Sequence, residues 1–268
     1  EIMKSYKHVN SILGKILISP KKWKKAEEKF CKQSENIIVV TNAAKDELSN
    51  RVSLNPKKII VFPNTVKKDF YNDYKLVPTI KQKFSKNFVL LYLGNTSKRR
   101  GLEIAIDSLI EIKNLIPEIK LVIVGSSSFD SKLKVLAKKK NVHNYISFEG
   151  WKDESYFPSY LDIADIGISP LESNIHHDTT YANKIFQYMS FGCAMICSDV
   201  LAQKEIIEKY KTGELFKAGS SKGFTKSVLE LYKNTEKMKT YSENGKIAIE
   251  HNLNNEIVSQ QIISMYGK

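Results

Sequence analysis

Short apolar runs rich in β-branched residues alternate with helical patterns along most of this chain of 268 residues. Strands that are apolar throughout and separated by helices are typical of a parallel sheet with helices on both faces. We expect strands at residues 37–41, 59–62, 89–93, 121–124, 146–148, 166–169 and 194–197. We expect helices at 102–115, 131–139, 183–191 and 203–208, and then only helices, at 221–233, 237–250 and 255–266. The predicted fold class is therefore α/β, with a doubly wound parallel sheet.

The expected domain limits follow from where these repeats are complete. Residues 63–87 are polar, contain two prolines and show no clear strand, which is typical of a linker. The residues before it provide two strands and a helix or two, too few to close a core. We therefore expect a partial N-terminal domain at 1–75, a complete doubly wound domain at 76–250, and a C-terminal helix at 251–268 that packs back towards the N-terminal part. The first residues resemble neither a signal peptide nor a natural start, which suggests a fragment.

The charge of the chain limits its partners. The formal net charge is +13, and residues 1–35 contain nine lysines against four glutamates, which suits an anionic membrane surface or an acidic substrate. The lysines are not interleaved with stacking aromatic residues and no nucleic-acid motif is present, so we expect no nucleic-acid partner. No apolar run approaches the ~18 residues of a transmembrane helix. Cys31, Cys193 and Cys197 lack a metal-binding spacing and suggest a reducing cytoplasm.

A basic loop with a glycine at each end, from Gly94 to Gly101, follows the third predicted strand and precedes a helix. Open α/β sheets bind ligands at the carboxyl ends of their strands. The glycines let the backbone approach a ligand, and Lys98, Arg99 and Arg100 favour a polyanion, because the arginine fork matches phosphate oxygens. A solvated loop in which Gly101 serves only packing is the alternative. The spacing is neither a dinucleotide fingerprint nor a P-loop.

A second polar loop, residues 171–182, leads into the helix that begins near Asn183. Backbone N–H groups at a helix N-terminus suit a phosphate. His176, His177 and Asp178 in this loop suggest a metal, but no other histidine or thiolate has a spacing that completes a site. We therefore expect no metal, and a loop that closes over a bound sugar or phosphate.

The run Gly219-Ser220-Ser221-Lys222-Gly223 has the form of the nucleophile elbow of serine hydrolases. A serine at a helix start is more often a cap, and the one later histidine lies in the terminal helical region, so a hydrolase is disfavoured. The absence of an Asp-x-Asp triplet argues against transferases that hold a nucleotide sugar through a divalent metal.

Five segments occur in the order of one known family: 37–42, 59–66, 92–102, 148–150 and 164–170. Together they resemble the glycosyltransferases of family 4, retaining enzymes of the GT-B fold that are also called glycosyl transferases group 1. In this resemblance the first segment is the last strand of the acceptor domain, and the second is the crossover into the donor domain, with Thr65 in place of the usual glycine. The third segment is the family's glycine loop.

The resemblance implies two Rossmann-like domains, of which the C-terminal one, here 76–250, binds a UDP- or GDP-linked sugar as co-substrate and the N-terminal one binds the acceptor. It implies no bound metal. It implies Arg100 and Lys184 as the catalytic cations, which hold the diphosphate and stabilise the charge on the leaving group. The base is expected near Trp151. The expected donor-binding residues are Gly94, Asn95, Lys98, Arg99, Gly101, Gly150, Trp151, Thr179, Thr180, Asn183 and Gln187.

The family's Glu-x(7)-Glu signature falls on Thr179 and Gln187, so both glutamates are missing. By the resemblance the second position accepts hydrogen bonds from the ribose hydroxyls, which the neutral carbonyl of Gln187 can still do. A neutral hydrogen bond contributes about 0.5–1.5 kcal/mol and a charged one about 1.5–3 kcal/mol. We therefore expect weakened binding at this position. The first half of the acceptor domain, with a histidine near the reacting sugar, has no counterpart in the chain.

The leading hypothesis is a retaining hexosyltransferase that builds a cell-surface glycan on a lipid-linked or polysaccharide acceptor. We expect it in the cytoplasm, peripheral at the inner face of the membrane. Two alternatives stay open. One is a GT-B enzyme that uses a nucleotide sugar without transfer, such as an epimerase or phosphorylase. The other is a non-catalytic binding module, which Gln187 and the missing half-domain favour.

Overall fold

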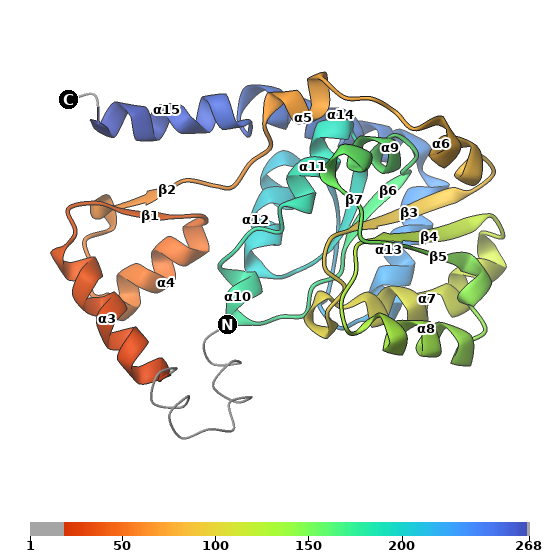
Figure 1. Ribbon diagram of the computed structural model, residues 1–268, viewed down its shortest axis with the longest axis horizontal. Coiled ribbons are helices and arrows are strands. Elements are labelled where there is room, and N and C mark those ends of the chain that lie inside the picture. The colour runs from red at the N-terminus through yellow and green to blue at the C-terminus, as the bar shows by residue number, and fades with distance from the viewer. Residues whose placement is uncertain (1–18, 267–268) are drawn as a thin grey trace. The chain divides into compact units, whose positions relative to one another are not determined.

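The computed structural model of the chain describes residues 19–266. The chain divides into two compact units, of which the first ends at Val61 and the second begins at Phe62. Each unit has its own buried apolar core: a small one in the first unit and two large ones in the second. Figure 1 shows the elements of both units.

The described part of the first unit contains α3 (Pro20–Gln33), β1 (Ile37–Val39), α4 (Asn42–Val52), the short η1 (Pro56–Lys58) and β2 (Ile59–Val61). Its two strands pair in parallel. The hydroxyl of Thr41 accepts a hydrogen bond from the N–H of Ala44 at 2.9 Å, which caps α4. Because Thr41 is used in this way, β1 ends before the predicted strand does. The core of the unit is formed by Leu48, Val52 and Ile59.

Six parallel strands form the sheet of the second unit: β3 (Phe88–Leu93), β4 (Ile119–Val124), β5 (Ile146–Gly150), β6 (Ile166–Ser169), β7 (Ala194–Ser198) and β8 (Gly213–Phe216). Their order in space is β5-β4-β3-β6-β7-β8. The chain begins in the middle, runs outward to β5, and returns to the other side of β3 with β6. This order makes the sheet doubly wound, with its switch point between β3 and β6. The predicted α/β class is confirmed.

Helices cover both faces of this sheet (Figure 1). One face is covered by α7 (Leu102–Leu115), α8 (Asp130–Lys139) and α13 (Ser221–Lys233). The other is covered by α9 (Phe157–Asp162), α11 (Lys184–Phe191), α12 (Leu201–Tyr210) and α14 (Thr235–His251). The remaining elements are α5 (Lys68–Asn72), α6 (Pro78–Phe84), η2 (Lys98–Arg100), η3 (His143–Tyr145), η4 (Glu154–Tyr156), α10 (Ile175–Asp178) and α15 (Asn255–Tyr266).

Alternate residues of each strand serve the two cores, as the two-residue period of a strand requires. In β3, Leu91 and Leu93 pack in the core that α11 joins. Leu90 and Tyr92, on the opposite face, pack in the core that α7 joins. Strands buried on both faces are apolar at nearly every position, which is why these runs are visible in the sequence.

Tyr188 of α11 fixes this helix over the two central strands. Its buried hydroxyl accepts a hydrogen bond from the N–H of Leu93 at 3.0 Å. The same hydroxyl lies within donating distance of the carbonyl oxygens of Leu91, at 3.0 Å, and Ile168, at 3.2 Å. A Cβ at Gly167 would lie 2.4 Å from the Tyr188 ring, so glycine is required there. One side chain therefore links α11 to β3 and β6 at the switch point.

Two parts of the second unit differ from the sequence expectation. The predicted linker contains two short helices, α5 and α6. Ile80 and Phe84 are four residues apart, lie on one face of α6 and are buried in the main core, so this part is packed rather than free. No strand is predicted from the sequence at β8, whose apolar run Glu214 interrupts. The structure places β8 at the sheet edge, where Glu214 forms an ion pair with Lys237 at 2.7 Å.

The last helix, α15, begins against the segment that follows β2. The N–H of Asn255 donates to the carbonyl of Val66 at 3.1 Å, and Lys68 forms an ion pair with Glu256. These contacts lie within the second unit as the structure divides the chain. The domain limits and the packing of residues 251–268 expected from the sequence stay predictions.

Candidate functional site

A cavity of about 430 Å³ lies at the carboxyl ends of β3 and β6. Its wall is formed by the loop after β3, the loop after β6 and the first turn of α11, with single residues from elsewhere in the second unit. β3 and β6 are neighbours in the sheet, and the strands that follow each of them extend the sheet in opposite directions. The cavity therefore lies at the switch point of the sheet. Ligands of doubly wound sheets bind in this place.

The loop after β3 is held by its own hydrogen bonds. Gly94 has a φ of 114°, which favours glycine, and its N–H donates to the carbonyl of Val124 at 2.8 Å. The side chain of Asn95 accepts from the N–H of Ser97 at 2.9 Å. The Tyr92 hydroxyl donates to the carbonyl oxygen of Asn95 at 2.6 Å. The loop backbone is therefore ordered without help from a ligand.

Gly101 joins this loop to the loop after β6. It has a φ of 71°, and a Cβ there would lie 1.8 Å from the carbonyl oxygen of Pro170. Beside it the N–H of Glu172 donates to the carbonyl of Arg99 at 3.1 Å. Gly101 thus has the packing role that the sequence left as the alternative, and it does not line the cavity.

Lys184, the first residue of α11, turns its amine into the protein. The residue is 7% exposed, and Nζ lies 3.4 Å from the centre of the Tyr92 ring. Nζ has no hydrogen-bond partner among the residues that the structure describes. Burial, and then the charge of nearby Arg100, hold the pKa of Lys184 well below its ordinary value. The Tyr92 ring favours the charged amine by up to about 2 kcal/mol, less than the several kcal/mol that burying an unpaired ion costs.

Two more nitrogen atoms of the cavity wall resemble Nζ of Lys184 in their burial and lack of a partner. Nε of Arg100 and Nε2 of His177 are buried and lack a hydrogen-bond partner within residues 19–266. Burial lowers the pKa of His177 to about 4, and the Arg100 charge acts in the same direction. No aspartate or glutamate is among the described residues that line the cavity. The cavity therefore presents Arg100 and Lys184 without a protein anion to neutralise them, which is the electrostatic condition for binding an anion.

The loop after β6 contains the short α10. The side chain of Asn174 caps it by accepting from the N–H of His177 at 3.1 Å. The hydroxyl of Thr179 donates to the carbonyl of Ile175 at 2.7 Å. Thr179 therefore completes this helical turn, and it does not line the cavity.

A second cavity, of about 410 Å³, adjoins the first at α11. Asn183 and Gln187 line both. The second cavity is also lined by Thr65, Phe70 and Glu154. The first turn of α11 therefore contributes to the walls of two cavities.

The structure brings together seven of the thirteen residues predicted for the site. Those that line the cavity are Gly94, Asn95, Arg100, Thr180, Asn183, Lys184 and Gln187. Lys98, Arg99, Gly101, Gly150, Trp151 and Thr179 are not part of its lining. Trp151 follows β5 and is 72% exposed, and the carbonyl of Gly150 accepts from the N–H of Gly125 at 2.7 Å. The roles assigned to these residues stay predictions.

Several lining residues have no place in the predicted site. They include Asn64, Phe157, Leu171, His176, His177 and Tyr181. The two histidines belong to the loop 171–182, which the sequence predicts to close over a bound sugar or phosphate, but neither is predicted as a site residue. Their position after β6, at a carboxyl strand end, is a signal for this cavity. Asn64 and Phe157 come from distant parts of the chain, and no local pattern places them there.

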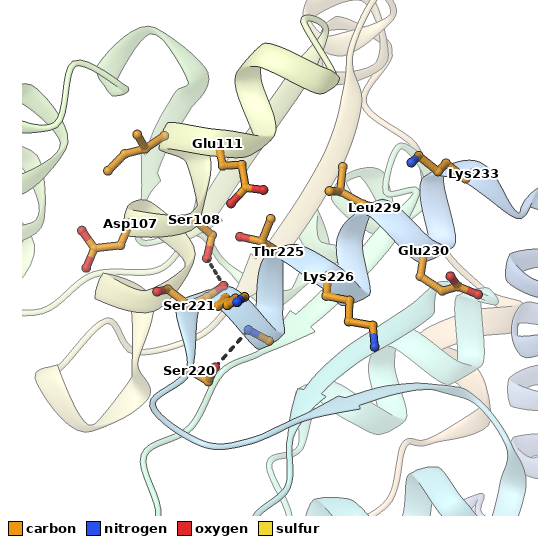
Figure 2. Close-up of a pocket in the computed structure, with 13 residues that line it drawn as sticks. Asp107, Ser108, Glu111, Ser220, Ser221, Thr225, Lys226, Leu229, Glu230 and Lys233 are labelled. Atoms are coloured by element: carbon orange, nitrogen blue, oxygen red, sulfur yellow. Dashed lines mark hydrogen bonds between the residues drawn. The ribbon is translucent and has the colours of Figure 1, made fainter.

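A larger hollow, of about 890 Å³, runs along α7 and α13 (Figure 2). Its charged side chains have both signs, including Asp107, Glu111 and Lys226, so it offers no single preference for an ion. Figure 2 shows Ser220, whose hydroxyl accepts from the N–H of Gly223 at 3.0 Å and caps α13. The serine run thus starts a helix, as the alternative to a nucleophile elbow predicts.

Two cysteines and the potential metal ligands are further reactive groups in residues 19–266. Cys193 and Cys197 are free and buried, and burial raises the pKa of each thiol to about 12, which keeps them protonated. Within the described residues, no group of three or more His, Cys, Asp or Glu side chains could hold a metal ion. In the same part of the chain no helix has the length and apolarity to cross a bilayer.

Residues 76–248 match the model of a family described as glycosyl transferases group 1. The chain belongs to this family. An uncharacterized glycosyltransferase of Methanocaldococcus jannaschii is 24% identical over 224 residues, which are 83% of this chain and 56% of that protein. WcaL of Escherichia coli, a candidate colanic acid biosynthesis glycosyltransferase, is 16% identical over 178 residues, 66% of this chain and 44% of that protein. This group 1 chain thus spans about half the length of the curated relatives it matches.

The fold of this group 1 chain also occurs in solved structures. HepE of Anabaena, solved in complex with UDP, superposes with a TM-score of 0.76 at 17% identity, over 87% of this chain and 64% of that one. At this identity the likeness concerns the fold, which is the Rossmann-like fold of GT-B glycosyltransferases.

Proposed function

We propose that this chain is the donor-binding part of a retaining glycosyltransferase of family 4. It binds a UDP- or GDP-linked hexose, which the complete protein transfers to a glycan or lipid-linked acceptor. The observation that supports this most is the pair of cationic side chains, Arg100 and Lys184, whose buried nitrogen atoms lack partners at one cavity among the described residues. A diphosphate has enough charge and acceptor oxygens to bind both.

The same two cations suit the chemical step. When the bond between the sugar and the diphosphate breaks, negative charge develops on the leaving phosphate oxygen. Arg100 and Lys184 are held at the switch point before any ligand binds, and their Nε and Nζ are shielded from water. Charges that are positioned in advance and poorly hydrated stabilise such a leaving group most. We assign them this role, with retention of the anomeric configuration proposed from the family resemblance.

The nucleoside fits the space beside α11 that Asn183 and Gln187 share. We propose that Gln187 accepts a hydrogen bond from the ribose, and that the base lies towards Gly150 and the exposed Trp151. Gln187→Glu replaces a neutral acceptor by a charged one, which is worth about 1 kcal/mol more. The variant should bind nucleotide roughly fivefold more tightly in calorimetry. Unchanged or weaker binding would remove Gln187 from the ribose site.

Calorimetric titration of the chain with UDP, GDP and ADP, free and sugar-linked, tests the proposal. Arg100→Ala removes one charge-assisted contact of about 1.5–3 kcal/mol, so it should weaken nucleotide binding about ten- to hundredfold. Lys226→Ala, in the hollow along α13, is the matched control and should have no effect. If calorimetry detects no binding of any nucleotide, the proposed donor site is wrong. Conversion of the donor without any acceptor, in a protein with a complete N-terminal domain, would favour an epimerase over a transferase.

For the acceptor we propose a cell-surface glycan or its lipid-linked precursor, with the protein on the cytoplasmic membrane face. A relative named for colanic acid biosynthesis supports the glycan. Helix α3 supports the membrane: Trp23 and Phe30 lie seven residues apart, hence on one helix face, and are 55% and 62% exposed. Its lysines favour an anionic bilayer. The chain should sediment with phosphatidylglycerol vesicles at low salt, and Trp23→Ala should reduce this. Equal sedimentation with neutral vesicles would contradict the electrostatic part.

A further inference from the structure

His177 is a buried titratable group of the cavity wall that the proposed function does not use. The residue is 1% exposed, in α10, and it lines the same cavity as Arg100 and Lys184. Its Nε2 has no hydrogen-bond partner within the described part of the chain. A polar atom that is buried without a partner loses a hydrogen bond that it makes in water. Such an atom in a cavity wall indicates where a polar group of a ligand can bind.

The protonation of the other ring nitrogen, Nδ1, determines whether Nε2 donates or accepts a hydrogen bond. Nδ1 of His177 lies 2.6 Å from the carbonyl oxygen of Glu172. A carbonyl only accepts, so Nδ1 must carry a hydrogen. The amide nitrogen of Asn174 lies 2.9 Å from Nδ1, but it donates to the same Glu172 oxygen at 3.0 Å, and the Asn174 oxygen accepts from the His177 N–H. The neutral ring therefore has its lone pair on Nε2.

The surroundings of the ring keep it neutral. Burial disfavours protonation most and outweighs the hydrogen bond to the Glu172 carbonyl, which favours it. The charges of Arg100 and Arg99 and the ring of His176, 5.5 Å away between centroids, also disfavour protonation. No carboxylate lines the cavity within the described residues to favour it. Near pH 7 Nε2 is thus a hydrogen-bond acceptor. A diphosphate at this pH offers only acceptors, so it does not pair with the neutral ring.

A hydroxyl group can be the partner, because it is a donor without charge. The ligand proposed for this cavity carries hydroxyls on its sugar, next to the diphosphate that Arg100 and Lys184 would hold. We propose that His177 is a specificity-determining residue, whose Nε2 accepts a hydrogen bond from a hydroxyl of the donor sugar. This inference rests on the proposed function. Because Nε2 is shielded from water in the structure, the loop 171–182 must open locally to admit the hydroxyl.

Two variants test the acceptor. His177→Phe keeps a flat ring and removes the acceptor, whereas His177→Gln keeps an acceptor oxygen. Dissociation constants are measured by calorimetry for UDP, UDP-glucose, GDP and GDP-mannose. A neutral hydrogen bond contributes about 0.5–1.5 kcal/mol, so His177→Phe should weaken binding of the preferred nucleotide sugar about three- to tenfold. Its affinity for the free nucleotide should stay within about twofold, which also shows that the variant is folded.

His177→Gln should retain more of the sugar-dependent affinity than His177→Phe. Equal losses for nucleotide and nucleotide sugar would overturn the inference, because they would place His177 at the phosphates or in the fold. No loss for either would overturn it as well. Wild-type chain that binds none of the four ligands would overturn the proposed function, and this inference with it.

Deoxy sugars give a second test, which begins with the wild-type chain. Donors that lack one hydroxyl at a time are titrated against the wild-type chain. One of them should bind about three- to tenfold more weakly than the parent. In His177→Phe the same deoxy donor and its parent should bind equally. If every deoxy donor binds the wild-type chain as the parent does, no sugar hydroxyl contacts Nε2 and the inference fails.

Discussion

Replacing Lys184 by methionine should weaken nucleotide binding with at most a small loss of stability. Methionine fills the same space on the Tyr92 ring and carries no charge. Removing a buried amine that lacks a partner within residues 19–266 gains about 1–3 kcal/mol of unfolding free energy, and losing the cation–π contact costs up to about 2 kcal/mol. The net change should lie between a loss of about 1 kcal/mol and a gain of about 3 kcal/mol of unfolding free energy. In the complex, the lost charge-assisted hydrogen bond of about 1.5–3 kcal/mol should weaken UDP or GDP about ten- to hundredfold.

Stability and binding are measured on the same samples. Denaturant unfolding and calorimetric titration compare the wild-type chain, Lys184→Met and the exposed control Lys226→Met. The pH dependence adds a second signature. Because the pKa of Lys184 is lowered in the folded chain, the unfolded chain binds more protons below pH 10.5, so this residue makes stability rise with pH there. Lys184→Met should remove that slope. A variant that is less stable than wild type by more than about 1 kcal/mol, or that binds nucleotide as tightly, would refute the reasoning.

Three further predictions concern the surroundings of the site. His177 has a pKa of about 4 against an ordinary 6.5, so as the pH falls the unfolded chain takes up a proton before the folded chain does, and up to about 3 kcal/mol of stability should be lost. Denaturant unfolding between pH 7 and pH 4 should show a smaller loss for His177→Gln; equal losses would contradict the assignment. Gly101 and Gly150 both have a positive φ, of 71° and 70°, but an added Cβ clashes with the surrounding backbone only at Gly101. Gly101→Ala should therefore lower the melting temperature far more, and equal shifts would show that the clash is relieved. Tyr188→Phe leaves the buried N–H of Leu93 without its acceptor and should cost about 1–3 kcal/mol in denaturant unfolding; a neutral effect would mean that water replaces the hydroxyl.

Much of the fold could be predicted from the sequence because the central strands are buried on both faces. Burial on both faces makes the run 166–169 apolar throughout, and β6 has these same limits. Helix α7 also has the predicted limits, since its apolar residues recur with the helical period. The edge strand β8 could not be predicted in this way, because one side of it contacts polar residues such as Lys237. Helix α6 of the predicted linker packs against α9, and no local pattern contains this contact.

The candidate site, too, could be predicted from the sequence in part only. Local sequence was enough for Gly94, Arg100 and Lys184, because a strand end, a basic loop and a helix start are short-range patterns. The burial of Lys184 on the Tyr92 ring was not predictable, since the two residues are brought together only by the pairing of β3 with β6 and the packing of α11.

The sequence by itself determined the fold class, the family resemblance and the cations at the strand ends. Only the tertiary structure decided that Gly101 joins two loops, that Thr179 completes a helical turn, and that His177 lines the cavity with one nitrogen unpaired. The physical reason is that burial and hydrogen-bond pairing belong to neighbours in space. Spacing along the chain fixes which residues reach a strand end, whereas the packing of distant loops fixes which of their polar atoms still need a partner.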